Sequence, residues 1–268
     1  MISFRSTTLR ESLRMEGTGL FLGNRATVVV HPGSSGLRLR SSNEWIEIAP
    51  EHVTTAERCT AVAGVRLVEH LLSALGGAGV TDVDIEVDGP EVPILDGSSA
   101  PWFEAIQGIG LIEQDPTRAF EVEREVTVAE GDAYVSVGPG DGVFRAVYER
   151  YPFPGRLEFS HRWEPATYGF EVAPARTFAA EEDVKRMQSE GLLSGGTTEN
   201  ALVFGQTGYF TACRFDDEPA RHKVLDCMGD MMLCGIPLRF LNASAERSGH
   251  RLHIAAARAL RLATRRLE

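Results

Sequence analysis

The sequence lacks any long apolar run. No stretch approaches the roughly 18 consecutive apolar residues that a membrane-spanning helix needs, and the N-terminal stretch MISFRSTTLRESLRM has no apolar core typical of a secretory signal. Cysteine is also scarce. The four residues are Cys59, Cys213, Cys227 and Cys234, and their spacing contains no C-x-x-C pair and no dense disulfide frame. We therefore expect a soluble, cytoplasmic protein with reduced thiols, in which Cys227 and Cys234 pack within a helix.

Positive charge is in deficit as well. The formal net charge is −11, whereas nucleic acids and anionic membranes bind clustered Lys and Arg. This balance disfavours both partners and favours a small molecule. The 268 residues are 43% hydrophobic and 24% charged, which is a globular composition, and the chain is long enough for one large domain or two ordinary ones.

The pattern of apolar residues predicts two halves of similar layout. The first half alternates strand-like runs and helical stretches, at 25–32 and 81–89 for strands and at 66–77 and 99–110 for helices. The second half repeats this order, with strands at 120–128, 132–138, 144–150, 168–173 and 199–204 and helices at about 217–234 and 250–266. The same supersecondary unit is therefore expected twice.

Pro and charged residues interrupt the pattern near 112–118, so we expect an N-terminal domain over 1–115 and a C-terminal domain over 116–268. A mixed sheet with two helices on one face leaves those helices uncovered, and packing the two halves helix layer to helix layer buries both. The predicted fold is thus α+β, a β-α-α-β sandwich with a cleft at the seam between its helix layers. The C-terminal half carries an inserted segment at about 179–197, whose stretch 181–196 is amphipathic.

The segment RHKVLDCMGD (221–230) places His222, Asp226 and Asp230 at successive four-residue steps. On an α-helix this spacing puts the three side chains on one face. The same helix has apolar residues for a core, namely Val224, Leu225, Met228 and Met232. A solvated polar stripe is the commoner explanation of such a pattern, and a chemical site is the alternative.

Catalytic zinc sites commonly combine three His or carboxylate ligands with an open position for water and a nearby Glu that acts as a base. His222 and Asp226 are two candidate ligands, because their four-residue offset points both at one metal ion. The H-E-x-x-H motif is absent, so a third ligand must come from elsewhere. VEHLL (68–72) offers Glu69 and His70 at the start of a predicted helix, where the helix dipole favours negative charge. Alternatively, both are ordinary polar residues of a first turn.

The stretch ERSGHRLH (246–253) places His250 between a Ser-Gly turn and the last predicted helix. Such a junction can hold an imidazole over a cleft, although lone histidines are more often structural. We expect the remaining histidines to be surface or packing residues: His31, His52, His161 and His253.

Two further stretches carry weaker signals. PARTF (174–178) contains Thr177, whose hydroxyl can stabilise an oxyanion. GTGLFLG (17–23) has the glycine spacing G-x-G-x-x-x-G, one residue longer than the dinucleotide-binding motif G-x-G-x-x-G. No Walker lysine follows it, so we reject a nucleotide-binding loop there.

Five segments, in this order, resemble the UDP-3-O-acyl-N-acetylglucosamine deacetylase family of lipid A biosynthesis. They are VEHLLSALGGAGVTDVDIEVDGPEVPILDGSSAPW (68–102), ARTF (175–178), GLLSGGTTENALV (191–203), RFDDEPARHKVLDCMGD (214–230) and SGH (248–250). The combination of VEHL, HKVLD and SGH in one chain is highly specific. The resemblance implies the two-domain sandwich, one catalytic Zn²⁺ ion and hydrolysis of the N-acetyl group of a UDP-sugar lipid precursor, with release of acetate.

The resemblance also implies residue roles. Three residues would bind zinc: His70, His222 and Asp226. Four would act on the amide: Glu69 as general base, His250 as acid or oxyanion group, Asp230 as the carboxylate that orients it, and Thr177 as an oxyanion-side hydroxyl. Three would contact substrate: Lys223, Phe178 and Arg247. An amide is a poor electrophile with a poor leaving group, so its hydrolysis requires Lewis-acid polarisation, an activated water and a proton donor.

The sequence departs from the family pattern around this set. Phe21 and Leu22 stand where His-Ser is usual, Arg247 replaces a lysine, and HRLHIAA (250–256) lacks the usual asparagines. These departures concern the substrate more than the reaction.

The expected acyl passage also differs, because Ala179, Ala180 and Glu181 replace larger apolar residues. We expect weak discrimination between long and short acyl chains, unless other apolar residues of the segment rebuild the passage, namely Val184, Met187, Leu192 and Leu193.

Three functions stay open from the sequence. The first is the deacetylase, the second a paralogue acting on another N-acetyl sugar, and the third a non-catalytic, metal-containing binding protein. Glu69 and His250 speak against the third, because a binding module needs neither a base nor an acid. The sequence does not indicate the oligomeric state.

Overall fold

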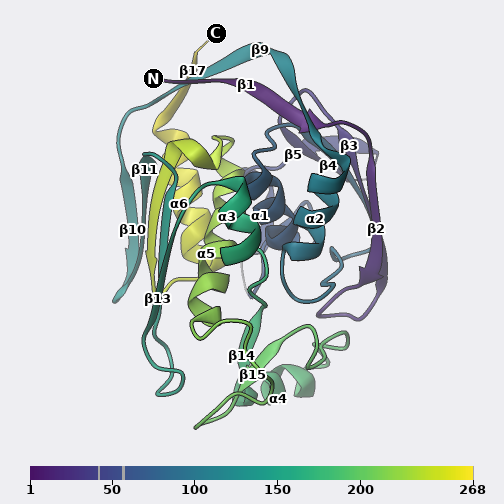
Figure 1. Ribbon diagram of the computed structural model, residues 1–268, viewed down its shortest axis with the longest axis vertical. Helices are drawn as coiled ribbons and strands as arrows, with labels where there is room; N and C mark the ends of the chain where they lie inside the picture. The colour runs from purple at the N-terminus through teal and green to yellow at the C-terminus, as the bar shows by residue number, and fades with distance from the viewer. Residues whose placement is uncertain (42, 56–57, 268) are drawn as a thin grey trace.

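Two five-stranded sheets form the outer layers of the molecule, and helices fill the space between them (Figure 1). The computed structural model describes residues 1–41, 43–55 and 58–267. This arrangement confirms the predicted α+β fold and the β-α-α-β sandwich.

The two sheets share one topology. The first has the order β2-β3-β8-β4-β5, formed by Leu13–Thr18, Arg25–Pro32, Val83–Asp88, Leu37–Ser41 and Glu44–Glu47. The second has the order β10-β11-β16-β12-β13, formed by Val126–Glu130, Ala133–Pro139, Leu241–Glu246, Val143–Tyr148 and Leu157–Arg162. In each sheet the last strand in sequence lies in the middle and makes the single parallel pairing, β8 with β4 and β16 with β12. The predicted repeat is therefore real.

The strands present alternate residues to the core, as their period of two requires. On β3, Val28 and Val30 are fully buried while Arg25 is exposed. On β11, Val135 and Val137 are likewise buried. Each sheet thus has one face against the helices.

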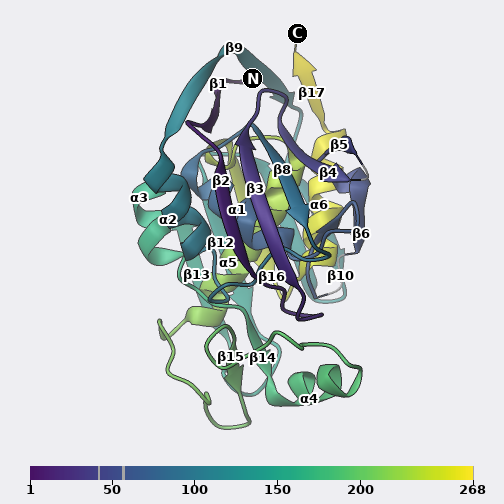
Figure 2. The same cartoon turned by 90° about the vertical axis from the view of Figure 1, so that its right-hand side faces the viewer.

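The inner layers contain α1 (Val68–Ala78), α2 (Ala100–Ile109), α3 (Pro165–Glu171), α5 (Glu218–Met231) and α6 (His250–Leu262), as Figures 1 and 2 show. The helices α1 and α5 pack against one another at the centre. Trp102 on α2 and Tyr168 on α3 are fully buried. The seam between the two helix layers therefore lies at the α1–α5 contact.

A three-stranded antiparallel sheet closes one end of the sandwich, where both termini lie (Figure 1). It consists of β1 (Ile2–Leu9), β9 (Leu111–Val122) and β17 (Thr264–Leu267). Strand β9 runs through the predicted join at 112–118, so the chain crosses between the halves as a paired strand. The division at 115/116 stays a prediction.

The inserted segment protrudes at the opposite end (Figures 1 and 2). It contains the helix α4 (Glu181–Ser189), and the parallel strands β14 (Phe178–Ala180) and β15 (Leu202–Phe204) lie at its two ends. The smaller elements are the strands β6 (Val53–Thr55) and β7 (Ala61–Val62) and the 3-10 helices Pro50–His52, Met232–Cys234 and Leu238–Phe240.

Several predicted elements differ in the structure. The segment 168–173 is not a strand, because Pro165 occupies the first turn of helix α3 and the chain stays helical to Glu171. The predicted helix 250–266 ends at Leu262, and β17 follows it. The predicted strand 120–128 covers the end of β9 and the start of β10.

The four cysteines are free thiols, and Cys227 and Cys234 are buried, as expected. Among the described residues, every helix falls short of the length and apolar character needed to cross a bilayer.

Candidate active site

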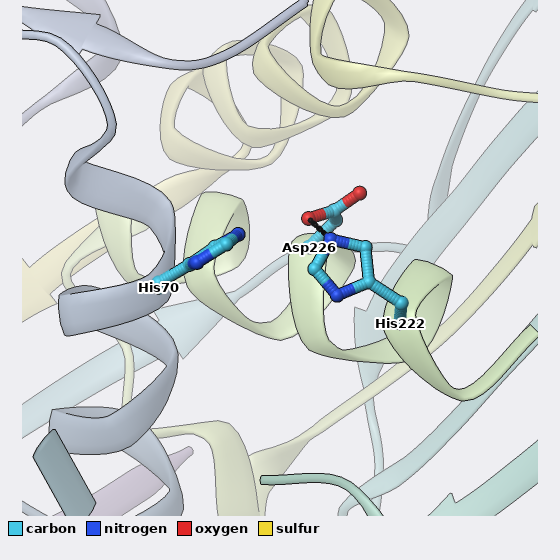
Figure 3. Close-up of side chains that lie close together, drawn as sticks. All are labelled: His70, His222 and Asp226. Atoms are coloured by element: carbon cyan, nitrogen blue, oxygen red, sulfur yellow. Dashed lines mark ion pairs between the residues drawn. The ribbon is translucent and has the colours of Figure 1, made fainter. Parts of the chain in front are cut away.

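The site lies where α1 and α5 approach most closely. Gly229 on α5 faces the backbone carbonyl of Glu69, and a Cβ atom at 229 would lie 2.2 Å from that oxygen. Only glycine allows this approach without moving a helix. The close contact brings His70, next to Glu69 on α1, opposite His222 and Asp226 on α5 (Figure 3).

His70, His222 and Asp226 converge in space. Their candidate ligand atoms lie within 4.8 Å of one another, and the two imidazole rings meet edge to face at a centroid distance of 5.1 Å. All three are at most 4% exposed. The alternative of a solvated stripe is wrong, because the stripe faces the seam between the helix layers.

The hydrogen bonds around His222 leave one nitrogen directed at this cluster. Its Nδ1 donates to the carbonyl oxygen of Ala175 at 3.0 Å, because a carbonyl can only accept. Its Nε2 lies 3.2 Å from Asp226 Oδ1, a buried oxygen that accepts no hydrogen bond from the described part of the chain. Two lone-pair atoms stay this close only if a proton or a metal ion lies between them.

His70 occupies the third corner. Burial, followed by the neighbouring His222, lowers the pKa of His70 to about 3, so its imidazole is neutral at physiological pH. Neutral imidazole is the form that binds metals. A metal ion uses all three groups, whereas a bridging proton serves only two. The residues therefore fit a metal ion.

Glu69 stands beside the cluster and is itself buried. Its Oε2 accepts a hydrogen bond from the backbone N–H of Thr60 at 3.0 Å, while Oε1 lies 3.9 Å from His250 Nε2. Burial raises the pKa of Glu69 to about 8, and His250 opposes this shift. A carboxyl with a pKa near neutrality can both take and return a proton.

His250 begins α6 and faces the same space from the other side. Its Nε2 lies 3.9 Å from both Glu69 Oε1 and Asp226 Oδ2, and its Nδ1 donates to Asp230 Oδ2 at 2.8 Å. Burial alone would lower the pKa of His250, but the charges of Asp230 and Asp226 outweigh it and raise the pKa to about 9. A charged imidazole therefore lies opposite Glu69.

Asp230 binds more groups than the sequence predicts. Its Oδ2 also accepts from His253 Nδ1 at 2.8 Å, and its Oδ1 accepts from the Thr60 hydroxyl at 2.5 Å. His253 is buried, as the packing alternative expects, but it does not lie apart from the site, because a three-residue offset in a first helical turn places it beside His250. Although Asp230, His250 and His253 are close enough to ligate an ion, hydrogen bonds already use both carboxylate oxygens.

A cavity of about 1050 Å³ opens from these groups. Its lining includes six of the catalytic and substrate-contact candidates named above: Glu69, Thr177, Phe178, Lys223, Arg247 and His250. The remaining candidate, Asp230, lies behind His250 and is fully buried. The structure thus brings the separated sequence motifs to one cavity.

The cationic candidates are already paired with carboxylates. Lys223 Nζ lies 2.7 Å from Asp226 Oδ2 and 5.4 Å from the centroid of the Phe178 ring. Arg247 pairs with Glu149 at 2.5 Å and with Asp132 at 3.4 Å. A substrate anion must therefore compete with carboxylates for these two cations.

The inserted segment gives the cavity an apolar wall. Ala179, Ala180, Val184, Met187 and Leu193 line it. Glu181 is absent from the lining and pairs instead with Lys185 on α4 at 2.5 Å. The Glu181 carboxylate, one of the departures from the family pattern, therefore points away from the cavity. Of the four residues expected to rebuild the passage, Leu192 is absent from the lining.

Sequence reasoning missed Thr60 and Gly229. Thr60 lies between α1 and α6 only through the tertiary fold, and no local pattern marks it. Gly229 stands one residue before Asp230 in a helix, where glycine is less stable than alanine. A glycine at such a position could have predicted a close contact with another helix.

Comparisons with known proteins agree with this geometry. The family model described as UDP-3-O-acyl N-acetylglycosamine deacetylase matches residues 6–261. Proteins named UDP-3-O-acyl-N-acetylglucosamine deacetylase are similar along nearly their whole length. That of Thermosynechococcus vestitus is 38% identical over 97% of this chain and 95% of its own. That of Cellvibrio japonicus is 37% identical, over 96% and 89%. Because the match spans both sheets and every residue around the cavity, the chain belongs to the UDP-3-O-acyl-N-acetylglucosamine deacetylase family.

Proposed function

We propose that this protein hydrolyses the N-acetyl group of UDP-3-O-acyl-N-acetylglucosamine, in lipid A biosynthesis, within the cavity between α1 and α5. The observation that carries the proposal is the contact between His222 Nε2 and Asp226 Oδ1 with His70 opposite. It supports a bound cation in a cavity that also holds a base and an acid. The family match along both halves supports the substrate class.

His70, His222 and Asp226 are the proposed ligands of one zinc ion, because two imidazoles and a carboxylate are a donor set typical of catalytic zinc. Zinc held there supplies Lewis-acid polarisation of the amide carbonyl and lowers the pKa of water. The Ala175 carbonyl fixes the His222 ring with Nε2 toward Asp226 Oδ1, where the ion would be held, and such a contact is usual behind a ligating histidine.

Glu69 is the proposed general base. The Thr60 N–H holds Oε2, which leaves Oε1 facing the cavity to take a proton from the attacking water. The water oxygen adds to the amide carbon, and Glu69 keeps the proton. Thr177 lines the same cavity, and its hydroxyl is proposed to stabilise the oxyanion.

His250 is the proposed acid. Its Nε2 faces the cavity, while Asp230 holds its Nδ1. When the C–N bond breaks, the leaving nitrogen takes a proton from His250, so that a free amine and acetate result. Cleavage without this proton would expel an amide anion, which is a very poor leaving group.

Lys223, Phe178 and Arg247 are proposed substrate contacts because all three line the cavity. The apolar wall formed by Val184, Met187 and Leu193 is the proposed path of the acyl chain. Each methylene buried there contributes about 0.8 kcal/mol.

The direct test compares purified protein on acylated UDP-N-acetylglucosamine and on the unacylated sugar. We expect acetate release from the acylated substrate with a far higher kcat/KM. Preference for the unacylated sugar would instead support a paralogue for another N-acetyl sugar. Binding without acetate release would support the non-catalytic alternative and contradict the proposal.

A further inference from the structure

We infer that His253 is a positioning residue for His250, acting through Asp230; the inference rests on the proposed role of His250. Both imidazoles donate Nδ1–H to the same oxygen, Asp230 Oδ2, at 2.8 Å each. Asp230 and His253 are fully buried, so water does not compete for these bonds. Thr60 occupies the other carboxylate oxygen.

The hydrogen-bond chemistry determines the tautomer of His253. A carboxylate only accepts, so His253 Nδ1 carries the hydrogen. In the neutral ring Nε2 is then the acceptor for the Ser248 hydroxyl, 3.0 Å away in the turn before α6. The result is a continuous chain in which Ser248 donates to His253 and His253 donates to Asp230.

This chain fixes the carboxylate in place. With only His250 and Thr60 bound, the Asp230 carboxylate could tilt. The Thr60 hydroxyl oxygen also lies 3.3 Å from His250 Nδ1 and competes with Asp230 Oδ2 for that N–H. The His253 bond occupies a second lone pair of Oδ2 and leaves one orientation. The His250 ring is thereby held with Nε2 toward Glu69 and Asp226.

The test replaces the donor while the core stays filled. His253→Leu removes the hydrogen bond, whereas His253→Asn places an amide N–H where Nδ1 stood. We expect His253→Leu to lower kcat about 10- to 100-fold, the usual effect of losing a group that orients a functional imidazole. KM and metal content should stay unchanged, and His253→Asn should recover most of kcat.

A matched control is His161→Leu. His161 is also buried, and its Nδ1 also donates to a carboxylate, Glu171, at 2.9 Å, but that pair lies apart from His250. Its loss should leave kcat unchanged. Equal kcat losses in His253→Leu and His253→Asn, or wild-type kcat in His253→Leu, would overturn the inference.

A measurement on the unaltered protein covers the case in which His253→Leu does not fold. ¹⁵N NMR of histidine-labelled protein should show His253, assigned by its absence from the His253→Asn spectrum, as the Nδ1–H tautomer. An Nε2–H tautomer would overturn the inference. His250→Ala distinguishes failure of the proposed function from failure of this inference. Wild-type kcat in His250→Ala would contradict the proposed function. A low kcat in His250→Ala together with wild-type kcat in His253→Leu would contradict only the role of His253.

Discussion

Gly229 on α5 lies against the main-chain carbonyl of Glu69 on α1, so closely that a Cβ atom would stand 2.2 Å from the oxygen. This contact sets the distance between the two helices that supply the candidate metal ligands. His70 follows Glu69 directly, and Asp226 precedes Gly229 by three residues. The geometry of the site therefore depends on a residue with no side chain.

Gly229→Ala should separate α1 from α5 and weaken metal binding. We expect a loss of about 1–3 kcal/mol in the free energy of unfolding, typical of overpacking, together with lower metal affinity. Urea denaturation and metal titration measure the two effects. Gly108→Ala on α2 is the control, because its Cβ meets open space and should add up to about 1 kcal/mol of stability. Unchanged metal affinity in Gly229→Ala would contradict the argument.

Glu69→Ala should keep the metal and lose turnover. A positioned general base contributes about two to four orders of magnitude to kcat. Steady-state kinetics and metal analysis of the same preparation are the measurements. A variant with the wild-type rate would remove Glu69 from the role of base, and a variant without metal would make it a ligand.

Acyl-chain preference should be steeper than the sequence suggests, because Glu181 lies outside the cavity and Met187 lines it. Full burial of each added methylene raises kcat/KM about fourfold, until the wall formed by Val184, Met187 and Leu193 is covered. Met187→Glu should abolish this rise. Lys185→Gln, on the exposed side of α4, is the control. A flat chain-length profile in the wild type would restore the sequence-based expectation.

The buried pair Glu218–Arg176 makes stability depend on pH. Glu218 accepts hydrogen bonds from Arg176 Nε at 2.9 Å and from the Arg214 N–H at 2.7 Å. Burial alone would raise the pKa of Glu218, but these donors outweigh it and lower the pKa. The ionised Glu218 carboxylate therefore stabilises the fold above about pH 4.5, the ordinary pKa of Glu. This stabilisation is lost as the pH falls through the lower pKa of Glu218 in the folded state.

Glu218→Gln should cost about 3 kcal/mol at pH 7, because it leaves the Arg176 charge buried without its partner. It should also lose less stability than the wild type on acidification below pH 4.5. Urea titrations across this range provide the comparison. Glu121→Gln removes an exposed carboxylate, paired with Arg265, and should change little. Parallel pH profiles for Glu218→Gln and the wild type would contradict this assignment.

The sequence predicted the residues of the candidate site more completely than the groups that hydrogen-bond to them. The four-residue steps of His222, Asp226 and Asp230 follow from helix geometry. Local patterns offered His70 and His250 as candidates, and the family resemblance assigned their roles. Thr60 and the Ala175 carbonyl were not predictable, because their contacts exist only once α1, α5 and α6 have packed.

The fold was predicted where the apolar period is clear and missed where it is ambiguous. The repeat of two halves followed from their strand and helix order. The segment 168–173 alternates apolar and polar residues as a strand would, but Tyr168 is buried and Phe170 exposed on a short helix. The predicted join near 112–118 lies within the long strand β9, whose pairing with β1 shifts register between Arg5 and Ser6.

Zinc content is the most direct measure of the central claim that His70, His222 and Asp226 hold the catalytic metal. Metal analysis of dialysed wild type should find about one zinc per chain. His70→Ala and Asp226→Ala should contain none while keeping the wild-type circular dichroism spectrum, and neither should release acetate. A fully metallated Asp226→Ala protein, or a metal-free wild type with full activity, would contradict the account.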